Sequence, residues 1–400
     1  MNARERFKAI CHFERPNDPC MWNVVSWNST LERWAQEGMP VTNLDNMKQV
    51  NMHLLGYQDQ KERIGPKAAL YGVGKNGQPP YVTPIDPIFE QKVIREEGEH
   101  LILQDFDGSI VERRKYDDTS IPRYIQYPVR DWQSWEEYRK LLNPFSPGRW
   151  PPGWDIITDD KLSWPVKPEQ EGKHWEARDF PLGMTALSLY GCPRNYMGVE
   201  NLSYALYDDP KLVEEMVEWQ AYLGYEMIKK VFDAGVTLDW VWLWEDMAYK
   251  GGSLVSPAWV KRVMVPRYRK VVDLLRSQSV DALVLDCDGN VDELLPIWVD
   301  CGINAIYPME VAAGNDSLQA RRRFGKDLVI VGGVDKRALA QGQREIDAEV
   351  AKCRELLKHG GFFPSVDHHI PPDIPYENMV YFLNELRKLS EYPETRRILG

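Results

Sequence analysis

The 400-residue sequence lacks a hydrophobic run of the roughly 20 residues that a membrane-spanning helix needs. Its opening, MNARERFKAICHFERP, is charged and contains no apolar signal segment. A basic stripe of the kind that binds nucleic acid is also missing, because the net charge is −11 and the densest basic cluster is the short RRRF at residues 321–324. We therefore predict a cytoplasmic protein that binds neither a membrane nor nucleic acid.

Cysteine is scarce and scattered, with six residues and no CxxC pair. This spacing excludes a zinc-finger type of site, and it favours buried or free thiols over a disulfide framework. The six positions are Cys11, Cys20, Cys192, Cys287, Cys301 and Cys353. Tryptophan is abundant instead, with 15 residues, and its large rings predict core anchors and pocket walls.

The second half of the chain contains five apolar segments of strand length, each followed by acidic residues. Such nearly continuous apolar runs are typical of strands that are covered on both faces. The segments are TLDWVWLWED (237–246), DALVLDCDGN (281–290), INAIYPME (303–310), DLVIVGGVDK (327–336) and GGFFPSVDHH (360–369). Helical patterns precede, separate and follow them, over residues 208–235, 256–278, 291–302, 316–325, 345–361 and 376–390.

This alternation predicts an α/β fold with parallel strands, which fits either a (β/α)8 TIM barrel or a doubly wound open sheet. No GxGxxG follows a strand, so the dinucleotide-binding version of the open sheet lacks support. A barrel also explains why acidic residues recur at strand ends, because all these ends meet at one mouth. We predict a single barrel domain over residues 1–400, with an irregular N-terminal cap or insertion over the mouth at about residues 40–175. Within that part, residues 99–116 predict paired strands and Asp131 predicts a helix cap.

The predicted catalytic residues are polar side chains that follow the strands. They are Glu245, Asp246, Asp286, Asp288, Glu310, Asp367 and His368. A single acid after a strand is most often a helix cap, and Asp335 before KRAL fits that description. Several acids at one mouth, however, raise one another's pKa and attract a proton or a cation.

Acid, thiol and imidazole side chains are also donors that zinc accepts in an open site. Alternate residues of a strand point to opposite faces, so Asp286 and Asp288 are predicted to face the mouth and Cys287 the helices. The predicted zinc ligands are therefore Asp286, Glu310 and His368. Trp22, Trp27, Tyr190 and Tyr307 are predicted to wall an apolar or cation-binding pocket, with core packing as the alternative for these rings.

Four stretches resemble the uroporphyrinogen decarboxylase superfamily. They are ARERFKAICHFERPNDPC at residues 3–20, LDCDGNVDELLPIWVDCGINAIYPMEVAAGND at 285–316, LVIVGGVDKRAL at 328–339, and GGFFPSVDHHIPPDIPYENMVYFLNEL at 360–386. The resemblance implies a (β/α)8 barrel whose cleft lies at the carboxyl ends of the strands. Asp288, Gly289 and Asn290 match the pattern of the relatives, which implies that Asn290 binds substrate.

The superfamily holds two chemistries. One branch decarboxylates uroporphyrinogen without a cofactor, and an arginine-rich segment near its start holds the substrate carboxylates. The corresponding CMWNVVSWNSTLERW has no arginine before Arg33, so this chain is closer to the other branch. That branch transfers methyl groups to or from a corrinoid or a thiol, often with Zn2+. Some of its members bind zinc through His-x-Cys and a later Cys, at positions where this chain has Asp286, Asp288 and, nearby, Asp335.

The resemblance therefore implies a corrinoid-linked methyltransferase. We expect it to demethylate an O- or N-methylated small molecule and to pass the methyl group to a corrinoid protein. Family members also often form homodimers. One alternative is a cofactor-free decarboxylase, in which Asp246 or Asp286 stabilises a cationic intermediate. A further alternative is a non-catalytic barrel that binds a small ligand.

Overall fold

The structure is a computed structural model that describes residues 1–14, 26–41, 54, 67–68, 85–115, 121–146, 155–157, 163–165, 178, 181–233 and 235–389. Two residues singled out in the sequence, Cys20 and Trp22, lie outside these ranges.

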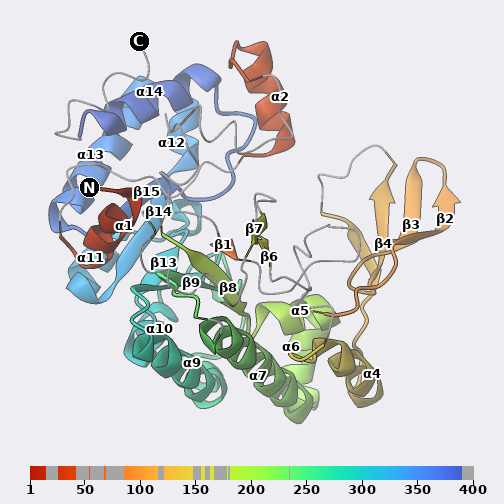
Figure 1. Cartoon of the computed structure of the whole chain (residues 1–400). Helices are drawn as coiled ribbons and strands as arrows, with labels where there is room; N and C mark the ends of the chain where they lie inside the picture. Colours follow the sequence, from red (N-terminus) through yellow and green to blue (C-terminus); the bar gives the residue numbers. More distant parts are fainter. Residues whose placement is uncertain are drawn as a thin grey trace.

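Seven parallel strands form the central sheet, in the order β1-β8-β9-β12-β13-β14-β15 (Figure 1). Their bounds are Lys67–Ala68, Gly183–Leu187, Trp240–Trp244, Ala282–Asp286, Ala305–Tyr307, Val329–Val334 and Phe362–Val366. The last five are the five strands predicted from the sequence. Strand β8 was not predicted, and β1 comes from the first half of the chain, which thus contributes the first strand of the sheet. The order and direction of the strands are those of a (β/α)8 barrel, although no pairing between β15 and β1 occurs within the described residues.

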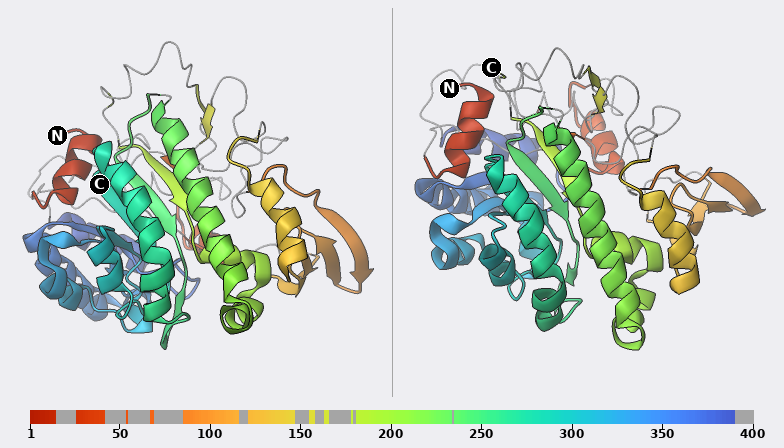
Figure 2. Two further views of the ribbon diagram at one scale, coloured as in Figure 1. Left: turned by 90° about the horizontal axis from the view of Figure 1, so that it is seen from below. Right: turned by 60° about the horizontal axis from the view of Figure 1, so that its bottom comes forward.

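Helices follow the strands and cover the outer face of the sheet. They are α7 (Pro210–Asp233), α9 (Val265–Ser277), α10 (Leu295–Cys301), α11 (Ser317–Phe324), α12 (Lys336–Gln341), α13 (Gln343–His359) and α14 (Tyr376–Arg387). Figure 2 shows α7 and α9 side by side across the sheet. The short helix α8 (Pro257–Trp259) and a π-helical stretch, η4 (Val260–Met264), precede α9. The helical segment thus contains a widened turn just before Pro266.

The first half of the chain carries smaller elements. An antiparallel sheet contains β2 (Lys92–Glu97), β3 (His100–Gln104), β4 (Ile110–Arg114) and β5 (Arg123–Gln126), and it lies to one side of the barrel (Figure 1). Helix α4 (Trp132–Tyr138) begins at Asp131, whose side chain accepts a hydrogen bond from the Ser134 N–H, as the sequence predicts. The 3-10 helix η2 (Arg139–Leu142) follows it. The remaining short elements are β6 (Asp155–Ile157), β7 (Ser163–Pro165), α5 (Gly191–Met197), α6 (Val199–Asp208), β10 (Ala248–Tyr249), β11 (Gly252–Ser253), η5 (Val311–Ala313) and η6 (Gly325–Asp327).

Two apolar clusters fill the two sides of the sheet. The outer cluster packs strand residues such as Val241 and Leu283 against the helices. The inner cluster fills the barrel with Trp240, Trp242 and other alternate residues of the same strands. This alternation follows from the period of two in a strand, and it assigns each strand residue to the helices or to the barrel interior.

Helix α1 (Ala3–Cys11) closes the end of the barrel at which the strands begin. Its Phe7 ring lies 5.4 Å from the Phe363 ring of β15. Arg4 Nε lies 2.9 Å from Asp239 Oδ1, and Lys8 Nζ lies 2.7 Å from Asp281 Oδ2. These two acids directly precede β9 and β12. The open end of the barrel is therefore the other one, where the strands end.

Helix α2 (Asn28–Gln36) is held by hydrogen bonds to the segment that follows β15. Trp34 Nε1 donates to the Ile374 carbonyl at 2.8 Å, and Thr30 Oγ1 donates to the Ile370 carbonyl at 2.7 Å. In the described ranges, every cysteine is a free and buried thiol, as predicted. No helix in those ranges is both long enough and apolar enough to cross a membrane.

Candidate functional site

Strand β9 lines the barrel interior with indole rings. In its sequence WVWLW, the period of two points Trp240, Trp242 and Trp244 to the inside, and their rings belong to or pack against the inner cluster. Trp242 Nε1 donates to Asp286 Oδ2 at 3.1 Å, and the Trp242 ring lies 5.0 Å from the Tyr307 ring. Asp286, Trp244 and Tyr307 are aligned in register at the ends of neighbouring strands and are partly exposed. Trp244, Tyr307 and Asp286, with Trp242 bonded to Asp286, thus form a surface of aromatic rings and one carboxylate at the open end of the barrel, which we call the aromatic floor.

The side chains of Asp286, Cys287 and Asp288 point alternately to the barrel side and to the helix side of the sheet, as predicted. Cys287 is buried in the outer cluster, where its Sγ accepts the Met247 N–H at 3.3 Å. Burial raises the pKa of the Cys287 thiol well above its ordinary value. This thiol is therefore neither ionised nor on the side of Asp286, so it is not a candidate metal ligand.

Asp288 and His368 form a pair at the mouth. Asp288 Oδ2 lies 3.1 Å from His368 Nε2, and both side chains are partly exposed. The hydrogen bond that His368 donates to Asp288 raises the pKa of His368, and burial partly opposes this effect. The two residues are 80 positions apart and meet only because β12 and β15 end at the same rim. The sequence prediction that His368 lies near the strand-end acids agrees with this geometry.

His369 turns toward α2 instead. Its ring lies 5.3 Å from the His368 ring and 5.1 Å from the Trp27 ring. Burial, and then the neighbouring His368, lower the pKa of His369. Trp27, a predicted pocket residue, is thus placed next to the His368–Asp288 pair through this intermediate ring.

Glu310 connects the loops that follow three strands. Its Oε2 accepts the Gly289 N–H at 2.9 Å, and its Oε1 lies 3.4 Å from Lys336 Nζ. Gly289 has φ +84°, and a Cβ there would lie 2.6 Å from backbone atoms of Ala248 and Tyr249, so only glycine fits this close approach. Glu310 is therefore both a mouth carboxylate and a loop anchor.

Asn290, the residue after this glycine, uses its side chain within the protein. Its Nδ2 donates to the Ala313 carbonyl at 3.1 Å, and its Oδ1 accepts the Asp292 N–H at 3.2 Å. Both ends of the amide are thus engaged in holding loops. The contacts of Asn290 explain its place in the fold without a substrate.

Glu245 is fully buried on the helix side of the sheet. Its Oε1 accepts from the Leu189 N–H at 2.9 Å and from the Tyr268 hydroxyl at 2.7 Å, while its Oε2 accepts from the Tyr190 N–H at 2.7 Å. Burial raises the pKa of Glu245 to about 7, against the effect of these hydrogen bonds. Glu245 therefore ties the loop after β8 to α9 rather than lining the mouth.

Asp367 is likewise fully buried. Its Oδ2 accepts the N–H groups of Val311 and Ala312 at 2.8 and 3.3 Å, and its Oδ1 accepts the Lys336 N–H at 3.2 Å. Burial raises its pKa, and the positive charge of Lys336 opposes this. Asp367 fixes the loops after β13 and β14, and so supports the positions of Glu310 and Lys336.

Asp246 pairs with an arginine that the sequence reading missed. Arg194, on α5, donates to the Asp246 carboxylate through Nη2 and to its carbonyl through Nη1. The guanidinium also lies over the Trp244 ring, 5.5 Å from its centroid. Arg194 was missed because it follows β8, which the sequence reading did not recognise as a strand.

Tyr190 does not wall the pocket as predicted. It is fully buried in the outer cluster, and burial raises the pKa of its hydroxyl to about 12. Asp335 fits its predicted role as a helix cap, since its side chain accepts the Arg337 N–H at the start of α12. Of the predicted pocket rings in the described ranges, Tyr307 and Trp27 remain at the mouth.

Comparison with known protein families gives a match to the second half of the chain. Residues 185–389, just over half of the sequence, match the family described as "Uroporphyrinogen decarboxylase (URO-D)". The chain belongs to the uroporphyrinogen decarboxylase family. The URO-D match begins at β8 and includes every strand from there to β15, and with them the Asp288–His368 pair.

A solved structure extends the similarity of this URO-D family member to nearly the whole chain. It is described as a "methyltransferase from Methanosarcina mazei", and it matches with a TM-score of 0.56 and 16% sequence identity. The match covers 97% of this chain and 99% of the other. At this identity the similarity establishes a shared fold. Comparison with curated protein sequences gives no match.

Among the described residues of this URO-D family member, the side chains that face the mouth do not make a zinc site as they stand. Within the ranges that the structure describes, no three His, Cys, Asp or Glu side chains gather in a way that would hold a metal ion. The three predicted ligands have other partners: Asp286 bonds to Trp242, Glu310 to Gly289 and Lys336, and His368 to Asp288. We derive no step through zinc.

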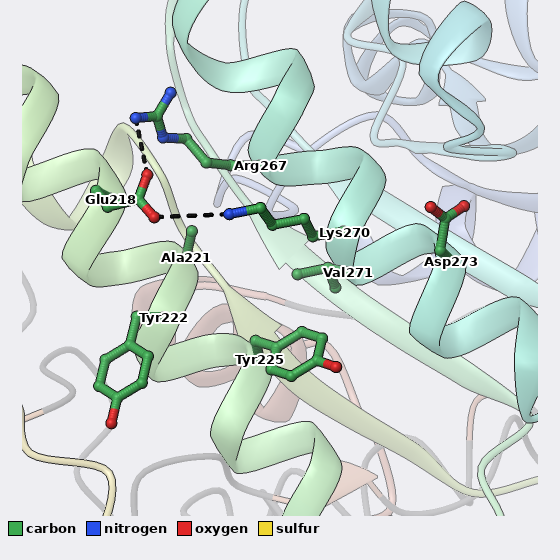
Figure 3. A pocket seen from close by; sticks show the side chains of 8 residues that line it. All are labelled: Glu218, Ala221, Tyr222, Tyr225, Arg267, Lys270, Val271 and Asp273. Atoms are coloured by element: carbon green, nitrogen blue, oxygen red, sulfur yellow. Dashed lines mark ion pairs between the residues drawn. The ribbon is translucent and has the colours of Figure 1, made fainter.

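A hollow of the URO-D barrel lies on its outer face, between α7 and α9 (Figure 3). Its volume is about 350 Å3, and Tyr222 and Tyr225 line it. Glu218 lies 2.8 Å from Arg267 and 3.8 Å from Lys270, so one carboxylate pairs with both cations. This outer groove is far from the strand ends, and it offers matched control positions for the site at the mouth.

Proposed function

We propose that this URO-D family protein is a methyltransferase that takes a methyl group from an O- or N-methylated small molecule and passes it to a corrinoid protein. The single observation that carries the proposal is the charge of the mouth. Among the described residues there, Asp246, Asp286, Asp288 and Glu310 are acidic, and Arg194 and Lys336 are each paired with one of these acids.

This charge distribution disfavours the other reaction of the family. Uroporphyrinogen carries several carboxylates, and binding them needs cations that are available to the substrate. Arg194 already contacts Asp246 through two nitrogens, and the Lys336 ammonium lies 3.4 Å from Glu310 Oε1. An acidic mouth repels such a substrate and accepts a neutral or positively charged methyl donor.

The Asp288–His368 pair supplies a proton donor for this reaction. When a methyl group leaves an ether, the remaining oxygen needs a proton, and an imidazolium next to the bond can provide it. Asp288 holds Nε2 of His368 and raises its pKa, so the ring is protonated over a wider pH range than a free histidine. The corrinoid, when its carrier protein binds, supplies the nucleophile that accepts the methyl group.

The aromatic floor orients the donor. The partly exposed Trp244 and Tyr307 rings provide apolar surfaces, and Asp286, which accepts a hydrogen bond from the Trp242 indole, provides an acceptor beside them. Such a mixture of apolar walls and few polar groups is typical of small-molecule sites. The similarity of the fold to a structure described as a methyltransferase is consistent with this assignment. We also propose the homodimer that the family resemblance predicts, which light scattering would test.

The test is an anaerobic incubation with free cob(I)alamin and a panel of methyl ethers and methylated amines. We expect a demethylated product, detected by mass spectrometry, from at least one donor. The variant His368→Gln should lose most of its activity on ethers, while His359→Gln, which changes an exposed histidine of α13, should retain it. Absence of product from every donor would contradict the proposal, and release of carbon dioxide from uroporphyrinogen would favour the decarboxylase instead.

A further inference from the structure

We propose that Glu310 is a positioning residue for the Asp288–His368 pair, and that it fixes the pair through a closed ring of hydrogen bonds between the loops at the mouth. This inference rests on the proposed function, in which the pair supplies the proton. It goes further than the function does, because it identifies what holds the proton donor in a defined geometry.

The first two links of this ring join the loop after β12 to the loops after β15 and β13. His368 Nε2 lies 3.1 Å from Asp288 Oδ2. The next residue in the chain, Gly289, donates its N–H to Glu310 Oε2 at 2.9 Å. The loop after β12 is therefore held on one side by the imidazole and on the other side by the Glu310 carboxylate.

A third link closes the ring. Val311, which follows Glu310, donates its N–H to Asp367 Oδ2 at 2.8 Å. Asp367 directly precedes His368, so the links return to the residue at which they began. Lys336, the first residue of α12, contacts the same two acids, because its N–H donates to Asp367 Oδ1 at 3.2 Å and its Nζ lies 3.4 Å from Glu310 Oε1. We call the residues of the three links, 288–289, 310–311 and 367–368, the loop ring.

The pair does not fix its own geometry. Strands β12 and β15 are separated by β13 and β14 in the sheet, so no strand pairing holds their ends together. The side chains of Asp288 and His368 are 40% and 31% exposed, and an exposed ion pair shifts an equilibrium by a factor of about five at most. The Asp367 carboxylate is fully buried and that of Glu310 is 19% exposed, and N–H groups bind such carboxylates more strongly than they bind neutral acceptors. The links through Asp367 and Glu310 therefore determine where the pair lies.

The backbone before Glu310 supports this role. Met309 is buried and has φ +53°, a left-handed conformation that is unfavourable for a residue with a side chain of this size. Such strain persists where the surrounding structure fixes it, and it is concentrated at functional sites. The direction of the Glu310 side chain is thus maintained at a cost in stability.

The exchange of the His368 Nε2–H proton with water, measured by NMR on protein with 15N-labelled histidine, tests the inference without a substrate. The signal is assigned by its loss in His368→Gln. Glu310→Ala should accelerate this exchange at least about fivefold, because the Gly289 N–H loses its acceptor and the loop that carries Asp288 is released. Glu310→Gln keeps an acceptor oxygen at this position and should stay within about twofold of the wild type.

The comparison of these two variants separates positioning from charge. Glu310→Ala and Glu310→Gln remove the same negative charge. A difference between them therefore does not arise from the charges around His368, which also include those of Asp288, Lys336 and the neighbouring His369. The difference reports whether the link to the Gly289 N–H is present.

The matched control is Glu218→Ala in the outer groove of Figure 3, where a glutamate also pairs with a lysine. This variant should leave the exchange rate unchanged. In the ether assay of the proposed function, Glu310→Ala should lower kcat at least about tenfold and change KM less than about twofold, because a misplaced proton donor affects the transition state and not the binding of the methyl donor. Glu310→Gln should recover most of this kcat.

The inference is overturned by equal exchange rates in the wild type and Glu310→Ala, by an equal acceleration in Glu218→Ala, or by the lack of an Nε2–H signal from His368 in the wild type. If Glu310→Ala does not fold by circular dichroism, hydrogen–deuterium exchange of the wild type decides. The Gly289 and Val311 amides should have protection factors within about tenfold of each other, since the loop ring opens as a unit, and a larger difference overturns the inference.

These results are distinguishable from a failure of the proposed function, because the exchange measurements need neither a methyl donor nor a corrinoid. A protein that demethylates ethers and shows no effect of Glu310→Ala on the exchange refutes only the positioning role. A protein in which Glu310 protects the His368 proton, but which demethylates no donor, refutes only the reaction.

Discussion

Replacing the buried Glu245 by glutamine should change how the stability of the protein depends on pH. The carboxylate accepts three hydrogen bonds, from the N–H groups of Leu189 and Tyr190 and from the Tyr268 hydroxyl. Glutamine keeps one acceptor oxygen and turns the other atom into a donor, so one of the buried N–H groups loses its partner. An unsatisfied buried donor costs about 1–3 kcal/mol. At low pH, we therefore expect Glu245→Gln to be less stable than the wild type by about this amount.

The pH dependence follows from the pKa of Glu245, which burial raises from 4.5 to about 7. Between these two values the folded protein keeps a proton that the unfolded chain releases. The stability that the raised pKa confers is complete below pH 4.5 and is lost as the pH rises through 7. The loss is about 1.4 kcal/mol per pH unit in this window, or about 3 kcal/mol in total. Glutamine does not titrate, so its variant lacks this loss.

Urea unfolding followed by circular dichroism, at several values from about pH 5 to about pH 8, gives the free energy of unfolding of both proteins. The difference between wild type and Glu245→Gln should shrink as the pH rises, and the order of the two can reverse above pH 7. A difference that stays constant over the range would refute the reasoning. It would mean that the three hydrogen bonds outweigh burial and keep Glu245 ionised.

Three further results are expected. Gly183→Ala should destabilise the protein by about 1–3 kcal/mol, because its Cβ would lie 2.0 Å from the buried Trp240 ring. The control Gly251→Ala, which places a Cβ beside an exposed tyrosine, should not destabilise the protein. Equal melting temperatures of the two variants would be inconsistent with this packing. Asp288→Asn should lower the pKa of His368, since it removes the main cause that raises it, and an unchanged NMR titration of the ring would exclude the pairing. Iodoacetamide should leave the cysteines of the described ranges unlabelled in the native protein at neutral pH, because all are buried; mass spectrometry that finds them alkylated without unfolding would disprove this.

The barrel could be predicted from the sequence where apolar strands alternate with amphipathic helices. The segments that contain β9, β12, β13, β14 and β15 were all recognisable, because each is a short apolar run bounded by acids or glycines. Strand β8 was not, since GMTAL is brief and lacks the β-branched and aromatic residues that usually indicate a strand. Because β8 was not recognised as a strand, Arg194, which follows it, was not recognised as a candidate site residue.

The residues that follow the strands could be predicted from the sequence, whereas the directions of their side chains could be predicted only in part. The period of two correctly separated Asp286 from Cys287, and the same rule applied to WVWLW would have assigned Trp242 and Trp244 to the interior. The period of two does not apply to Glu245 and Asp367, because both residues follow their strands in irregular loops. Their side chains turn to backbone N–H groups instead of the mouth, and only the tertiary structure shows these donors.

Helix α1 has a consequence for the order in which the protein assembles during synthesis. It leaves the ribosome long before its partners Asp239 and Phe363, which come more than 200 and 300 residues later. The apolar face that carries Phe7 therefore stays uncovered until β15 has also been synthesised. A nascent chain that stalls before β15 lacks the contact between Phe7 and Phe363 that helps to close this end of the barrel.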